Sequence, residues 1–214
     1  MPAVVVDPAA AEAKPTGAQS ATVLPPTRVA VAGRAFELSA HRPSRLLLKD
    51  IEPVFRPDLD AAFAAEPAGK HESREAFLRT CLLVLPVWQP AALDLSVVSP
   101  EVSAERKELC RHFVAFREAL ASRLAPHWLD ASDPRTGQAM FGASTTATYN
   151  ELEGLTQCLK YKFEPFGCCG IVMHPEWGKK AYPVSVFTTA PVEELVGAVE
   201  DLARGAAGAP EAEE

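Results

Sequence analysis

The sequence has no apolar run near the roughly 18 residues that a membrane-spanning helix requires, so we expect no membrane span. It also has no long basic stretch. The formal net charge is -7, and the basic pairs Arg106-Lys107 and Lys179-Lys180 stand alone. A nucleic-acid-binding protein needs clustered Lys and Arg side chains to neutralise phosphates. We therefore expect neither a membrane nor a nucleic acid as a partner.

Local fingerprints of common enzymes are also missing. The motifs GxSxG, GxxxxGK[ST], GxGxxG and HExxH are absent, and there is no CxxC pair. The sequence thus offers no local signature of a hydrolase, a phosphate-binding loop, a dinucleotide site or a zinc protease.

The five cysteines, an odd number, occur in a sequence without secretory features, which predicts free thiols in a reducing compartment. The first arginine is Arg28 and the only earlier basic residue is Lys14, unlike an Arg-rich mitochondrial leader. We expect a cytoplasmic protein.

Composition divides the 214 residues into three segments. Residues 1–26 are rich in Ala and Pro, and residues 205–214 are acidic. Neither segment has enough apolar surface to offset the entropy of ordering, so both are predicted to be disordered. Residues 27–204 alternate between strand-like and helix-like patterns and are long enough for one domain.

Hydrophobic periodicity predicts the elements of that domain. Strands are expected in a hairpin around Gly33, at 81–85 before Pro86, at 93–97, at 168–174 and at 182–188, with a turn at 175–178. Helices are expected at 104–124, after a capping box formed by Thr148 and Glu151, and at 192–203. Residues 130–148 have little periodicity and predict a structured loop. This pattern is typical of an α+β domain with an antiparallel component.

The segment GCCGIVMHPEWG, residues 167–178, holds the densest set of chemically active side chains. Strand alternation places the odd-numbered side chains of 169–173 on one face, which we interpret as the core face. The even-numbered side chains of 168–174 then share the other face. Because Gly170 has no side chain, the sulfur of Cys168 would be open to a large ligand or a metal centre.

Other interpretations of these residues stay open. A free cysteine is often only a small buried hydrophobe. A zinc site would need Cys158, Cys168, Cys169 and His174, although adjacent cysteines point to opposite faces of a strand. A Cys168–His174 dyad is excluded on an unbroken strand, because six residues at about 3.3 Å each separate the two side chains by roughly 20 Å.

Several short motifs occur in a fixed order from residue 127 onward. They are HWLDASDPRTG at 127–137, MFG at 140–142, FGCC at 166–169, His174, Trp177-Gly178 and SVFTTA at 185–190. In this order and spacing the sequence resembles the CblD family, roughly over residues 46–192. We interpret the Asp130–Asp133 part of the first motif as a structural turn.

The resemblance implies a nitroreductase-like fold, with a mixed sheet and flanking helices but no bound flavin. It implies an adapter, not an enzyme, that passes cobalamin from a CblC-type processing protein toward methionine synthase and methylmalonyl-CoA mutase. The first cysteine of the family's pair, here Cys168, is implied as a thiolate ligand to cobalt. One thiolate is enough, because the corrin ring already holds the equatorial positions of the metal.

Two other functional classes remain as alternatives. A flavin-dependent reductase would need basic residues around the FMN phosphate, and the sequence shows no convincing set. A thiol redox or metal-binding module would use Cys168 and Cys169.

Overall fold

The computed structural model describes residues 19–166 and 169–207 of the chain. A five-stranded sheet has the order β1-β2-β3-β7-β4, and β5 and β6 form a separate two-stranded ribbon. The strands are β1 Ala21–Val31, β2 Arg34–Arg42, β3 Leu83–Pro90, β4 Leu129–Ala131, β5 Lys162–Phe166, β6 Cys169–Met173 and β7 Ala181–Thr188. The helices are α2 Arg45–Ala65, α3 Arg74–Cys81, α4 Pro100–Leu124, α5 Glu151–Cys158 and α6 Val192–Ala207.

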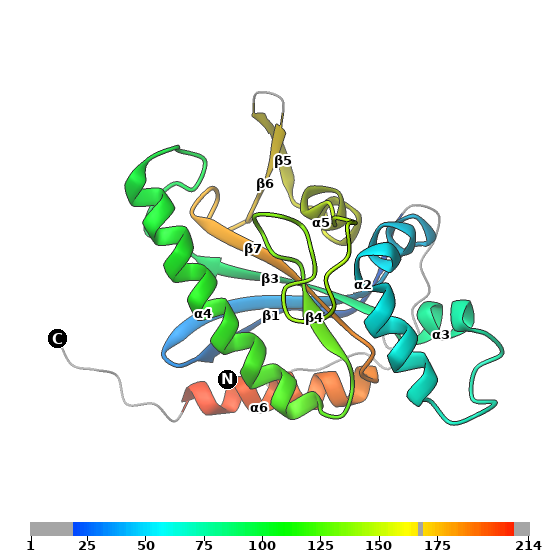
Figure 1. The fold of residues 1–214 in the computed structure, drawn as a ribbon. Helices are drawn as coiled ribbons and strands as arrows, with labels where there is room; N and C mark the ends of the chain where they lie inside the picture. Colours follow the sequence, from blue (N-terminus) through cyan, green and yellow to red (C-terminus); the bar gives the residue numbers. More distant parts are fainter. Residues whose placement is uncertain (1–18, 167–168, 208–214) are drawn as a thin grey trace.

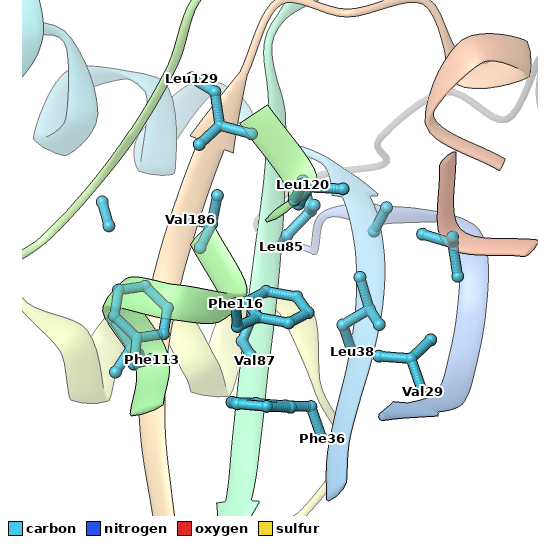
Figure 2. Packing of buried hydrophobic residues seen from close by; sticks show 14 of the residues in the cluster. Val29, Phe36, Leu38, Leu85, Val87, Phe113, Phe116, Leu120, Leu129 and Val186 are labelled. Atoms are coloured by element: carbon cyan, nitrogen blue, oxygen red, sulfur yellow. The ribbon is translucent and has the colours of Figure 1, made fainter. Parts of the chain in front are cut away.

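Helices cover both faces of the five-stranded sheet (Figure 1). Strand alternation sends Leu85 and Val87 of β3 to the face covered by α4 and α6, where Phe113 and Phe116 of α4 pack (Figure 2). Val84 and Trp88, also on β3, point to the other face of the sheet, which is covered by α2, α3 and α5. The α+β prediction with flanking helices is confirmed. The expected mixed sheet is not, because every ladder between the described strands is antiparallel.

The predicted hairpin is present between β1 and β2. Its two-residue turn has positive φ at both positions, 50° at Ala32 and 73° at Gly33. This is the conformation that two-residue hairpin turns require, and glycine adopts it without steric cost. The hairpin therefore follows from a local signal.

The domain begins earlier than composition predicted. Strand β1 starts at Ala21, and the side chains of Val23 and Leu24 are fully buried. Pro25 and Pro26 follow at a register shift in this edge strand, where a missing N–H is tolerated. Residues 21–26 therefore belong to the sheet and not to an arm. At the other end, α6 continues to Ala207, and the remaining predicted disorder lies outside the described residues.

Two strand predictions were wrong. Pro86 does not end β3, because it pairs with Ser185 of β7 at a point where the ladder between β2 and β3 is interrupted. Residues 93–97 form a loop instead of a strand. There the carboxylate of Asp94 accepts a hydrogen bond from the backbone N–H of Ser96 at 2.8 Å, and such local bonds compete with strand pairing.

The three predicted helices are present, although α4 begins earlier and α6 ends later than predicted. Helix α4 begins at Pro100, where the hydroxyl of Ser99 accepts from the N–H of Val102 at 3.2 Å. The side chain that caps α5 is Asn150, not Thr148, so the capping box does not form. Glu151 points inward instead, as described below.

Candidate functional site

The ribbon of β5 and β6, residues 162–166 and 169–173, projects away from the five-stranded sheet (Figure 1). We call it the arm. Phe166 and Cys169 are its last described pair. Cys168, the predicted cobalt ligand, follows Phe166 by two residues and lies outside the described residues. The sequence predicted β6 but missed β5, whose residues Pro165 and Lys162 do not favour a strand.

The two faces of β6 are the reverse of the predicted ones. Val172 is 7% exposed and packs in the core beneath the arm, whereas Ile171 and Met173 are only partly buried. The even-numbered face therefore points to the body. Alternation shows which side chains share a face, but the packing partners decide which face is buried, and these partners come from distant segments.

Gly170 does not leave an open approach on the arm. A Cβ atom added to Gly170 would lie 2.0 Å from the ring of Phe163, on the opposite strand. The ring covers the glycine while the Phe163 residue remains 47% exposed. Gly170 is thus required for close packing of this ring, which fills the space at Gly170, and the approach to the sulfur of Cys168 lies outside the described residues.

A buried polar cluster lies at the base of the arm. His174, directly after β6, is 3% exposed, and its Nε2 lies 2.8 Å from Oε1 of Glu37 on β2. The hydroxyl of Tyr161, directly before β5, donates to the same oxygen at 3.1 Å. Both ends of the arm are therefore bonded to one carboxylate of the main sheet.

The hydrogen bonds of His174 define its tautomer. Its Nδ1 accepts from the backbone N–H groups of Glu176 and Trp177, each at 3.3 Å. The proton of a neutral ring is then on Nε2, which donates to Glu37. Because both ring nitrogens are occupied, His174 holds the arm and is not available as a general base.

The charge at this cluster is concentrated on Glu37. The hydrogen bond from His174 lowers the pKa of Glu37 against the opposing effect of burial. Arg28 adds an ion pair at 3.6 Å. Burial, together with the neighbouring Glu37 carboxylate, raises the pKa of Tyr161. Glu37 is therefore an ionised acceptor, and Tyr161 remains a neutral donor.

Aromatic rings enclose the same cluster. The rings of His174 and Trp177 stack with centroids 4.0 Å apart, and Trp88 lies 5.4 Å from His174 on the side of the sheet. Arg28 lies 5.5 Å over the Trp177 ring. The turn closes at Gly178, whose φ of 55° favours glycine, and the predicted 175–178 turn is confirmed. These contacts attach the base of the arm to the main sheet, and we call this cluster of residues the joint.

Asp130 lies on β4 within the DP-containing motif and binds the backbone of the MFG motif. Its carboxylate accepts from the backbone N–H groups of Ala131, Phe141 and Gly142 at 2.7, 3.0 and 2.9 Å. Burial raises the pKa of Asp130, and these three bonds oppose that rise. These bonds give Asp130 a structural role and join the first two sequence motifs, but Asp130 and Ala131 belong to a strand and not to the predicted turn.

Sequence reasoning missed the role of Glu151. Its buried carboxylate accepts from the hydroxyls of Ser132 and Ser185, both at 2.7 Å. Burial raises the pKa of Glu151 against these two bonds. Ser132 and Ser185 belong to two separate sequence motifs, and Glu151 joins them at the start of α5, the helix beneath the arm.

The remaining cysteines show no metal site in the described part of the chain. Residues 19–166 and 169–207 contain no group of three or more His, Cys, Asp or Glu side chains that could hold a metal ion. Cys158 is 8% exposed, and burial raises the pKa of its thiol to about 12. The zinc alternative also needs Cys168 and Cys169, whose side chains are not among those described.

Among residues 19–166 and 169–207, no helix is both long enough and apolar enough to span a membrane.

The sequence profile of the methylmalonic aciduria and homocystinuria type D protein family matches residues 32–202. The chain therefore belongs to this family, which confirms the resemblance to CblD and extends it at both ends. It is 31% identical over 139 residues to the human cobalamin trafficking protein CblD, covering 64% of this chain and 43% of that protein.

Two further relatives have the same name. The mouse protein is 32% identical over 117 residues, covering 54% of this chain and 40% of its own length. The rat protein is 34% identical over 111 residues, covering 51% and 38%. The chain thus spans about two-fifths of the length of these curated relatives.

Proposed function

We propose that this chain is an adapter in cobalamin trafficking, with no catalytic activity of its own. It binds a cobalamin-loaded CblC-type processing protein and offers the thiolate of Cys168 to cobalt. The relatives are named cobalamin trafficking proteins, which supports cobalamin as the molecule that is transferred. The observation that carries the proposal is the arm, a projecting ribbon whose base is bonded to Glu37 of the main sheet and whose strand β5 ends two residues before Cys168 in the sequence.

The shape of the arm suits a cargo held by another protein. Two strands of five residues, at about 3.4 Å per residue, give a ribbon roughly 17 Å long. Such a ribbon can extend a single thiol beyond the body of the domain. Cobalt in cobalamin needs only an axial ligand, and coordination to a metal deprotonates a thiol.

The enzymes that receive the cobalamin and the cellular location of the chain are proposed from the same resemblance. We propose transfer toward methionine synthase, methylmalonyl-CoA mutase or both, by a cytoplasmic protein. The antiparallel sheet covered by helices on both faces is compatible with a nitroreductase-like fold that works without flavin.

An absorbance titration tests this function. Wild-type protein added to the cobalamin-loaded CblC-type partner should change the cobalamin spectrum, and Cys168→Ser should not. Cys169→Ser is the matched control for the neighbouring thiol and should behave as wild type. A spectral change that survives Cys168→Ser would reject the thiolate role. FMN released from denatured protein, or stoichiometric zinc, would instead support the flavin or metal alternatives.

A further inference from the structure

An exposed apolar surface lies on the loop between β3 and α4, residues 91–98, which we call the docking loop. Leu93 is 39% exposed, Val97 is 51% exposed and Val98 is 97% exposed. Val98 precedes the helix cap Ser99, a position whose apolar side chain often packs against the fourth residue of the helix. That residue is Ser103, so the helix offers Val98 no apolar partner.

The docking loop is held in place although its apolar side chains face water. The carboxylate of Glu105 accepts from the backbone N–H groups of Ala92 and Leu93, the latter at 3.0 Å. The guanidinium of Arg106 donates to the carbonyl of Leu95 at 2.6 Å. Ordering a loop costs conformational entropy. These bonds offset that cost and keep the apolar side chains of the loop presented at the surface.

The docking loop is bonded to the base of the arm. The N–H of Leu95 donates to the carbonyl of Lys179 at 3.0 Å, and that of Ala91 donates to the carbonyl of Lys180 at 2.9 Å. The ammonium of Lys179 lies 3.2 Å from the carboxylate of Glu164 on β5. The loop and the arm occupy the same end of the sheet (Figure 1). A protein that receives the arm must therefore approach the docking loop.

We infer that the docking loop binds an apolar surface of the cobalamin-carrying partner while the arm reaches the cobalt. This inference rests on the proposed function and identifies a surface of the chain that contributes affinity for the cobalamin-carrying partner. A partner is favoured over a second copy of the chain for two reasons. Three apolar side chains alone are too small a surface for a stable dimer, whereas a partner that receives the arm would contact both the loop and the arm. The loop is also continuous with the arm, which engages the partner.

Aspartate substitutions in the loop test this inference. Val97→Asp and Val98→Asp should each raise the dissociation constant for the cobalamin-loaded CblC-type protein by about tenfold or more, because a carboxylate would enter an apolar contact. At saturating partner the Cys168-dependent spectral change should persist. Leu46→Asp is the control, since Leu46 is 51% exposed like Val97 and lies in the first turn of α2, which follows the Arg42 end of β2.

The possible results distinguish failure of the docking-loop inference from failure of the proposed function. Unchanged affinity in both valine variants, beside a spectral change that still needs Cys168, would overturn the docking loop alone. If the wild-type chain does not bind the partner, both the proposed function and the docking loop are rejected. A dimer seen by light scattering and abolished by Val98→Asp would assign the surface to a second copy and contradict the inference.

Discussion

The joint at the base of the arm leads to a quantitative prediction. Replacing Glu37 with Ala removes the acceptor for Nε2–H of His174 and the hydroxyl of Tyr161, at 2.8 and 3.1 Å. His174 is 3% exposed, so water cannot fully replace its bond. A buried donor without a partner costs about 1–3 kcal/mol. We therefore expect Glu37→Ala to lower the free energy of unfolding by about 2–4 kcal/mol in total.

The same carboxylate predicts a dependence on pH. The pKa of Glu37 is lower in the folded protein than its ordinary value of 4.5. Its ionised form therefore stabilises the fold fully above pH 4.5, and this stabilisation is lost as the pH falls through the folded value. The difference in unfolding free energy between wild type and Glu37→Gln should be largest at neutral pH and should narrow in acid.

Two assays test this reasoning. Urea unfolding at several pH values gives the stability difference, with Glu118→Gln on the exposed side of α4 as the control. Amide hydrogen exchange shows where the loss occurs, and the amides of the arm should lose more protection than those of α4. Wild-type stability in Glu37→Ala, together with unchanged exchange in the arm, would refute the account of the joint.

Three further predictions concern the body of the domain. Gly154→Ala should lower the free energy of unfolding in urea by about 2–4 kcal/mol, because the new Cβ would lie 1.7 Å from the hydroxyl of buried Tyr149. Gly197→Ala is the control: no atom lies within 4 Å of its added Cβ, so it should raise the same free energy by about 0.5–1 kcal/mol. The pKa of Glu151 is raised by burial, so wild type should lose stability as the pH rises above 4.5. Urea unfolding at two pH values should show a smaller loss in Glu151→Gln, the opposite sign to Glu37→Gln. Burial raises the pKa of the Cys158 thiol to about 12, so iodoacetamide should leave it unmodified in the native state and modify it in urea, as read by peptide mass spectrometry.

Local signals predicted several parts of the fold that depend on near neighbours, but not the helices α2 and α3. The hairpin follows from Gly33, and α4 follows from apolar residues spaced by three and four up to Leu124. The strand prediction at 93–97 failed because the carboxylate of Asp94 accepts from the backbone N–H of Ser96, a contact that periodicity does not report. The prolines at 25 and 26 suggested disorder, but an edge strand accommodates them.

The candidate site was only partly accessible from the sequence. The motifs predicted strand β6 of the arm, whereas Cys168 as the cobalt ligand stays a prediction. They did not show that Glu37 accepts from His174, because 137 residues separate the two. The buried face of β6 was misassigned for the same reason, since the core beneath it is built from distant helices. Glu151 matched a capping pattern, yet two distant serines bind its carboxylate.

The most direct test of the central claim is cobalt X-ray absorption on the chain mixed with its cobalamin-loaded partner. The account predicts a sulfur ligand to cobalt with wild-type protein and with Cys169→Ser, and its absence with Cys168→Ser. A cobalt with no sulfur ligand in the wild-type mixture, or a sulfur ligand that persists in Cys168→Ser, would contradict it.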